Sequence, residues 1–461
     1  MLVFGSGARV AAQAPGLPRA VNVEAVAELI ALEHLYGDNT LFCGVHLVLP
    51  GTVLRFRNGM LSQTRYVDYQ FPEYYDILSE EHYIEEWKLR ARRAVARQAR
   101  GPAPLGVMLT GGLDSRTILG MLAANSTINL RTITFGIPDC DDELAARAMA
   151  QALHVPHVFI PLPHDYLAHQ AVKGVRITDG QKSVVHFNMI GALDRVTQES
   201  RTLYKGFLGG TMHGDGVTHD RLAPVREAVW FEHVFQVHNC IFAERVLPEV
   251  YTDTMYQQVR DVPRQTVRQA YARSHAQSWA DKSSYVEMYE EDVRFTVMGV
   301  ELARSQALVR TPLADRDLLS LATSVPPGYR VDKAYYRNAI SQALPKLAKV
   351  DYARTQRPVT DGCFRYVRKH TNELTRYWLR NHGIGVPLRR PQPYADYGSW
   401  MRKGLRPWIE GTLLSAQSLG RGYFRPAYIR KLVAEHMNGV DHTRRLGVLL
   451  ALELWHQQFI D

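Results

Sequence analysis

A short apolar run that passes through two glycines into a helical pattern constrains the fold of this chain most. The stretch from Leu105 to Ser115 reads LGVMLTGGLDS. Further apolar runs at 130–135, 157–162 and 203–208 alternate with helical patterns at 113–124 and 143–153. Strands that alternate with helices at this spacing form βαβ units, whose strands are parallel. The sequence therefore predicts an α/β fold built on a parallel sheet.

The glycine turn between strand and helix is typical of a phosphate site. Glycines let the backbone approach a ligand, and the amides and dipole of the following helix attract an anion. Thr110 and Ser115 can add hydroxyl donors, and Asp114 can hold a magnesium ion that bridges phosphate oxygens. No lysine follows Gly112, so this is not the lysine-containing P-loop. The alternative is a tight turn that needs glycine only for its backbone geometry.

The segments before and after the predicted parallel sheet have different secondary-structure patterns. The first seventy residues predict a small α+β piece, with a helix over 23–35, strands at 45–49 and 53–56, and a hairpin turn at Asn58-Gly59. A charged amphipathic helix is expected over 80–100. From about residue 225 to the end the pattern is mostly helical, and we find no internal repeat.

Composition limits the class of protein. A chain of 461 residues is too long for one ordinary core, and 46% hydrophobic with 22% charged residues excludes a mainly disordered chain. The 55 Lys+Arg against 46 Asp+Glu indicate a basic surface, a phosphate-rich substrate or a nucleic acid. Four scattered cysteines argue against a disulfide scaffold or a zinc site. Without a signal peptide or an adequate apolar span, we expect a cytoplasmic protein.

Several blocks, in order along most of the chain, carry a resemblance to a known family. Thr110–Ser115 resembles the Ser-Gly-Gly-x-Asp-Ser pyrophosphate loop of the ATP-pyrophosphatase enzymes. The segments 137–143, 309–315, 333–337 and 422–455 are similar to blocks of asparagine synthetases. The resemblance implies a PP-loop ATP-pyrophosphatase domain of the adenine nucleotide alpha hydrolase-like type, with a helical C-terminal region.

The resemblance also divides the chain. Residues 37–51 are similar to the second half of the family's glutaminase domain, which in full form has a cysteine directly after the initiator Met. Here residue 2 is Leu2 and the first cysteine is Cys43. We therefore expect residues 1–72 to be a partial Ntn-hydrolase-like segment without its nucleophile and without glutaminase activity. Residues 79–461 are then the synthetase domain.

The resemblance implies an ATP- and magnesium-dependent reaction. A substrate carboxylate attacks the α-phosphate of ATP, and ammonia or an amine then displaces AMP from the acyl-adenylate and leaves an amide. Lys333 matches the family's catalytic lysine, with Arg337 four residues on, and Asp114 is the implied magnesium ligand. The implied nucleotide-binding residues are Leu109, Thr110, Gly111, Gly112, Asp114, Ser115, Phe135, Gly206 and Gly209.

Two departures from the family pattern bear on activity. Gly210 and Thr211 stand where the family has an Asp-Glu pair, and Leu308 stands where a Glu is frequent. His213, Asp215 and the acidic run 141–143 are candidates to replace the lost carboxylates, or else surface-loop residues.

Four hypotheses about the function of the chain remain open. The first is a ligase of asparagine-synthetase type that uses ammonia or a separate glutaminase, as a monomer or a homodimer. The second is a specialised ligase similar to β-lactam synthetases or lasso-peptide cyclases, in which the substrate carries the amine. The third is a catalytically degenerate nucleotide-binding homologue. The fourth is a nucleic-acid enzyme, suggested by 12 Lys/Arg against 5 Asp/Glu in residues 351–410 but disfavoured because that region lacks an aromatic stacking platform.

Overall fold

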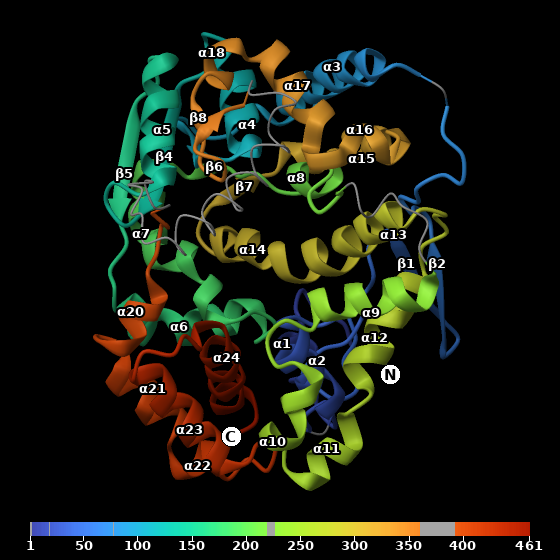
Figure 1. Cartoon of the computed structure of the whole chain (residues 1–461), viewed down its shortest axis with the longest axis vertical. Helices are drawn as coiled ribbons and strands as arrows, with labels where there is room; N and C mark the ends of the chain where they lie inside the picture. Colours follow the sequence, from blue (N-terminus) through green and yellow to red (C-terminus); the bar gives the residue numbers. More distant parts are fainter. Residues whose placement is uncertain (1, 18, 77, 219–225, 360–391) are drawn as a thin grey trace, which may run out of the picture.

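A five-stranded parallel sheet forms the upper part of the molecule in Figure 1. The computed structural model describes residues 2–17, 19–76, 78–218, 226–359 and 392–461. The strand order is β5-β4-β3-β6-β7, and every neighbouring pair is parallel. This confirms the predicted fold class. The strands are β3 (Leu105–Met108), β4 (Leu130–Gly136), β5 (His157–Pro161), β6 (Thr202–Tyr204) and β7 (Leu308–Arg310).

Two strands differ from expectation. The run 203–208 was expected to be one strand, but β6 ends at Tyr204, because the chain then turns through Gly206 into a short helix. The edge strand β7 lies in a region expected to be mostly helical. It is three residues long and its first residue is exposed, so it carries too few side chains for a period-2 pattern to show.

Helices cover both faces of the sheet, which explains why β3 is buried at every position. Helices α4 and α5 pack on one face, with α3, α15, α17 and α18 behind them, and α7 and α14 pack on the other. Ser79 caps α3 by accepting a hydrogen bond from the His82 amide. These helices are α3 (Glu80–Gln98), α4 (Leu113–Ala123), α5 (Asp141–Ala152), α7 (Asn188–Glu199), α14 (Met298–Arg304), α15 (Arg316–Ser324), α17 (Ala334–Ala343) and α18 (Pro345–Ala348).

The lower half of the molecule is helical, as the sequence predicted (Figure 1). Helices α6 and α24 pack against each other at its centre. No helix in the described ranges is long and apolar enough to cross a bilayer. The remaining helices from this half are α6 (Tyr166–Thr178), α9 (Glu227–His238), α10 (Leu247–Val250), α11 (Asp253–Val259), α12 (Val262–Ala272), α13 (Trp279–Val286), α20 (Tyr397–Arg402), α21 (Arg406–Leu413), α22 (Ala416–Leu419), α23 (Pro426–Met437) and α24 (Thr443–Phe459).

Short helical segments connect these layers. A π-helix, η4 (Glu287–Thr296), continues α13 towards α14 beneath the sheet. Short two-residue strands β8 (Asp351–Tyr352) and β9 (Arg357–Pro358) pair antiparallel after α18. The other short segments are η1 (Val184–His186), α8 (Gly209–Met212), η3 (Glu244–Val246), η5 (Pro312–Ala314), α16 (Pro327–Arg330) and η6 (Val331–Lys333).

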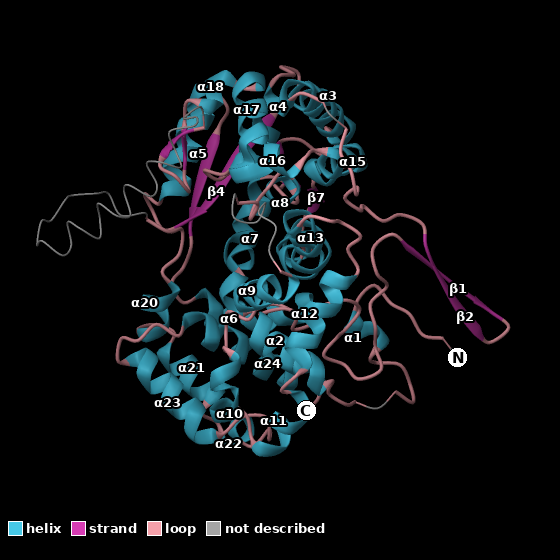
Figure 2. Cartoon of the chain, turned by 45° about the vertical axis from the view of Figure 1, so that its right-hand side comes forward, coloured by secondary structure: helices cyan, strands magenta, loops and turns pink. Residues whose placement is uncertain are grey.

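The N-terminal segment consists of α1 (Ala8–Ala11), α2 (Val23–Leu32) and a hairpin of β1 (Thr52–Arg57) and β2 (Met60–Arg65). The hairpin turn lies at Asn58-Gly59 as predicted, and both residues have positive φ. Figure 2 shows the hairpin reaching away from the helices. The strand expected at 45–49 was wrong: this stretch is not a strand, because it pairs with no strand in the described part of the chain.

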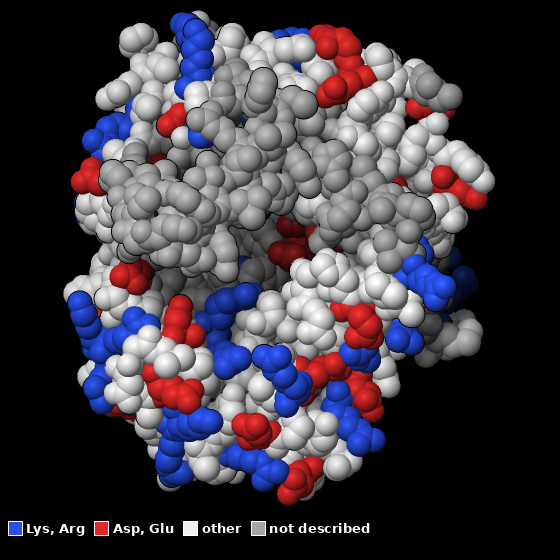
Figure 3. Space-filling view, viewed as in Figure 1, with Lys and Arg blue, Asp and Glu red and all other residues white. Residues whose placement is uncertain are grey.

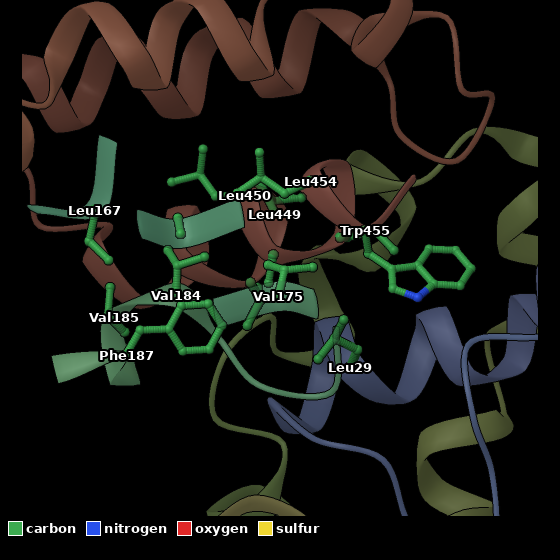
Figure 4. Close-up of a cluster of buried hydrophobic side chains, with 14 of the residues drawn as sticks. Leu29, Leu167, Val175, Val184, Val185, Phe187, Leu449, Leu450, Leu454 and Trp455 are labelled. Carbon is green, nitrogen blue, oxygen red and sulfur yellow. The ribbon is translucent and has the colours of Figure 1, made fainter. Parts of the chain in front are cut away.

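The main core joins the N-terminal segment to the C-terminal helices. Leu29 of α2, Val175 of α6 and Trp455 of α24 belong to one buried cluster, and Figure 4 shows these side chains converging from three elements. Burial of each large apolar side chain contributes about 1.5–3 kcal/mol. Helix α2 is therefore part of the core that supports the synthetase-like region, although the boundary expected near residue 72 stays a prediction.

Candidate active site

A cavity of about 380 Å³ opens at the carboxyl ends of β3, β4 and β6. This edge of a parallel sheet is where α/β folds bind ligands, and the volume is that of a small-molecule site. The turn after β3 lines it from Leu109 to Ser115 except at Gly111, and Phe135 at the end of β4 and Gly206 after β6 complete the sheet side. The structure thus brings most of the residues expected to bind nucleotide into one cavity.

The glycine turn is held by its own side chains. The Thr110 amide donates to Ser115 Oγ (3.1 Å), and the Gly112 amide donates to Thr110 Oγ1 (3.2 Å). The Gly111 amide donates to Asp142 Oδ1 (2.9 Å) and so faces α5. A side chain at Gly111 would collide with Ala353, its Cβ lying 2.4 Å from the alanine Cβ. The amides of residues 110–112 therefore have side-chain partners, which leaves those of the first turn of α4 to meet an anion.

Helix α4 begins at Leu113 behind Gly112, which offers no side-chain cap. The first-turn amides of a helix have no partner within the helix. Because this end of α4 lines the cavity, these amides and the helix dipole create positive potential there.

Asp114 is oriented by two hydrogen bonds and by two close glycines. Tyr336 Oη donates to Asp114 Oδ1 (3.0 Å), and the Gly210 amide donates to Oδ2 (3.2 Å). A Cβ at Gly206 or Gly209 would lie 2.6 Å from atoms of the Asp114 side chain. Burial raises the pKa of Asp114, and the nearby Lys333 ammonium opposes that rise. Gly209 therefore leaves room for the Asp114 side chain and does not itself line the cavity.

Lys333, at the end of η6, also lines the cavity. Asp332 and Lys333 both have left-handed backbone conformations (φ 51° and 60°), which non-glycine residues adopt rarely and mostly where function requires it. Lys333 Nζ lies 2.9 Å from Asp215 Oδ2, and Arg354 Nη1 lies 2.9 Å from the other oxygen of Asp215. Burial would raise the pKa of Asp215, but Lys333 and Arg354 lower it overall.

Sequence reasoning missed several residues of the cavity. Asn188, Lys205, Tyr352 and Tyr394 line it, and none of them stands in a recognisable motif. Lys205 follows the last residue of β6, and its neighbour Gly206 was the only signal for that position. Of the acidic run 141–143, only Asp142 lines the cavity, whereas Glu143 pairs with Arg147.

Other candidate residues lie outside the cavity. The Arg337 guanidinium donates to the Val359 carbonyl (2.9 Å) and does not line the cavity, so a direct catalytic role for it stays a prediction. His213 is buried: Trp87 Nε1 donates to its Nε2 (3.1 Å), and Tyr335 Oη bonds to its Nδ1. Both nitrogens of His213 are engaged, so it cannot replace a lost carboxylate at the cavity.

The donor set fits magnesium only in company with phosphate. Among the described residues no group of three or more His, Cys, Asp or Glu could hold a metal by itself. Magnesium is commonly bound by one or two carboxylates together with substrate phosphates and water. Asp114 beside the uncapped end of α4 meets that requirement.

The comparisons with known proteins agree with this geometry. A model of the asparagine synthase family matches residues 86–190 and 387–457. The "Putative asparagine synthetase (glutamine-hydrolyzing)" of Mycobacterium tuberculosis is 21% identical over 500 aligned residues, covering 97% of this chain and 69% of that protein. The chain is thus similar to asparagine synthetases over most of its length. The matched segments carry the glycine turn and Asp114 at one end and helices α20–α24 at the other.

A shorter similarity is found to two fungal amidases. Amidase chyE of Penicillium rubens is 37% identical over 89 residues, which are 19% of this chain and 13% of that protein. Amidase chry2 of Gibberella zeae is 34% identical over 89 residues, with the same coverage. These alignments are local, and the chain spans only a small part of either amidase.

Proposed function

We propose that this chain is an ATP-dependent ligase that activates a carboxylate as an acyl-adenylate and converts it to an amide. The observation that carries the proposal is the meeting of the 109–115 turn and Lys333 in one cavity, although they are over two hundred residues apart in the chain. Adenylation requires a phosphate cradle and an ammonium in the same cavity, since negative charge develops on the phosphates in the transition state.

In the first half-reaction the substrate carboxylate displaces pyrophosphate from the α-phosphorus. The first-turn amides of α4 with Thr110 and Ser115 hold the β- and γ-phosphates, and Asp114 would hold magnesium, which neutralises phosphate charge. In this scheme the adenine base of ATP lies between Leu109 and Phe135. Lys333, presented by its left-handed backbone, stabilises the charge on the α-phosphate.

In the second half-reaction an amine attacks the acyl carbon and AMP leaves. Free ammonia, an amine within the substrate and ammonia from a separate glutaminase are the candidate donors. Helix α2 contributes packing to the main core beside α6 and α24. A homodimer is compatible with this scheme and is not required by it.

A degenerate nucleotide-binding protein is the second candidate. Gly210 and Thr211 replace the Asp-Glu pair, and this favours lost turnover. Asp142 and Asp215 at the cavity favour retained activity, because they keep negative charge near Asp114.

The hypothesis of a nucleic-acid enzyme has less support. On the face drawn in Figure 3, Lys and Arg alternate with Asp and Glu over the lower half. Most of the basic 351–410 region lies outside the described residues.

The deciding experiment is ATP–pyrophosphate exchange against a panel of carboxylic acids, with and without ammonium. Exchange that depends on one class of acid supports the ligase. Lys333→Met serves as the control for adventitious exchange, since it should bind ATP and exchange poorly. Measurable ATP binding with no exchange for any acid, in wild type as in the control, would favour the degenerate homologue.

A further inference from the structure

The carboxylates that line the cavity are all engaged. Asp114 accepts hydrogen bonds from Tyr336 and Gly210, Asp142 accepts from the Gly111 amide, and Asp215 pairs with Lys333. No other Asp or Glu of the described residues lines the cavity. Amide formation needs a group that removes a proton from the attacking nitrogen. The cavity therefore offers no carboxylate free for that task.

Lys205 is the other ionisable side chain of the cavity with an amine. It follows the end of β6 and lines the cavity, and its Nζ donates to the Gly299 carbonyl of α14 (3.1 Å). Among the described residues no carboxylate forms an ion pair with it, whereas Lys333 is held by Asp215. A lysine that keeps one hydrogen bond to a carbonyl can be neutral and present its lone pair to the cavity.

We propose that Lys205 is the general base of the amide-forming step, an inference that rests on the ligase function proposed above. The amine nitrogen attacks the acyl carbon, and a C–N bond forms as the carbonyl electrons move to oxygen. The nitrogen is then cationic, and the neutral Lys205 amine takes one of its protons. The carbonyl reforms as the C–O bond to the phosphate breaks, and AMP leaves with the electron pair. The lysine returns its proton to water after product release.

The surroundings of Lys205 favour its neutral form. Burial lowers the pKa of Lys205 to about 8. The amine of Lys182, from the loop before η1, is also buried, and burial together with the nearby Lys205 lowers the pKa of Lys182 to about 7. Glu33 and Glu291 face Lys182, while Asp114, Asp142, Asp215 and Lys333 share the cavity. The base is thus available just above neutral pH, where an amine nucleophile is also partly neutral.

Two matched variants separate a base from a mere cation. Lys205→Arg is always cationic and keeps a donor for Gly299 but cannot accept a proton, and Lys205→Met removes both the donor and the base. With the acid identified by the exchange panel, we expect acid-dependent exchange in both variants to stay within about threefold of wild type. Amide formation from ammonia should fall about 10²–10⁴-fold in both, which is the usual contribution of a general base.

A series of amines and a pH profile complete the test. Hydroxylamine is weakly basic, so its cationic adduct loses a proton to water easily, and the loss in Lys205→Arg should be smaller with hydroxylamine than with ammonia. The wild-type rate with hydroxylamine should rise through pH 8, and that step should vanish in Lys205→Arg.

Two results would overturn the assignment. One is normal ammonia-dependent turnover in Lys205→Arg, which would make Lys205 a structural cation. The other is an equal loss of exchange and amide formation, which would place Lys205 in adenylation. Failure of the ligase proposal itself looks different, because wild type would then show no acid-dependent exchange at all.

Discussion

Asp215 holds Lys333 at the cavity through an ion pair of 2.9 Å, and its second oxygen holds Arg354 at the same distance. One carboxylate therefore pairs with two cations, of which Lys333 lines the cavity. The ion pair fixes the position of the Lys333 ammonium. This pairing was not predicted, because Asp215 and Lys333 lie in separate blocks of the sequence.

Loss of this pair should impair chemistry more than binding. In Asp215→Asn, Lys333 loses its anchor, and we expect exchange to fall about tenfold, since a misplaced catalytic group costs rate. The ATP dissociation constant should change little, because α4 supplies the phosphate donors. Isothermal titration with ATP and exchange kinetics measure the two effects. A large loss of ATP affinity with normal exchange would contradict this role.

Lys333 and Arg337 should behave differently when replaced. Lys333→Met should lower exchange about 10²–10³-fold, the usual cost of removing one electrostatic donor at a transition state. Arg337 bonds to the Val359 carbonyl, so Arg337→Met should chiefly lower the urea midpoint. Exchange rates and urea unfolding of both variants test this contrast. Equal catalytic losses at matched stability would restore the direct role that the sequence suggested for Arg337.

Asp114 should make nucleotide binding depend on magnesium. We expect Asp114→Asn to weaken ATP binding about 10–100-fold in magnesium, the usual effect of perturbing a metal site, and to change it little in EDTA. Asn keeps the acceptor for Tyr336 and removes the charge, so folding should survive. Titrations of wild type and variant with and without EDTA give the comparison. Identical magnesium dependence in both proteins would exclude Asp114 as the ligand.

Buried histidines should make the fold sensitive to acid. Burial lowers the pKa of His213 to about 3, and nearby Arg330 and Lys333 act in the same direction. Because the unfolded histidine titrates near 6.5, the unfolded chain binds the extra proton between the two values. His213 thus stabilises nothing extra above pH 6.5 and costs up to about 1.4 kcal/mol per pH unit below it.

The contribution of His213 to the urea midpoint of unfolding should therefore be flat above pH 6.5 and should decline towards pH 4. His34 and His456 are lowered to about 3 and about 4 by burial and add to the decline. His213→Gln, whose amide oxygen can accept from Trp87, should have a lower midpoint at pH 7.5 but a shallower decline. An unchanged slope in His213→Gln would show that His213 titrates normally.

The sequence predicted secondary structure correctly where residues close together in the chain determine the backbone conformation. The apolar runs 105–109 and 130–135 became β3 and β4, and Asn58-Gly59 became the hairpin turn, because their patterns express local backbone preferences. The prediction of a strand at 45–49 was wrong because a strand needs a neighbouring strand to pair with. The sequence does not say whether such a neighbour is present. Edge strand β7 was not predicted, because three residues are too few to show a period-2 pattern.

The sequence by itself determined the α/β class, the glycine turn with Asp114 and the candidacy of Lys333, since each depends on residues close together in the chain. Only the tertiary structure decided that Asp142 accepts from the Gly111 amide and that His213 is buried with both ring nitrogens bonded. It also placed Lys205 in the cavity, with no carboxylate partner in the described part of the chain. Those outcomes depend on burial and on contacts between distant segments. Such contacts set pKa values and hydrogen-bond partners, and no local pattern encodes them.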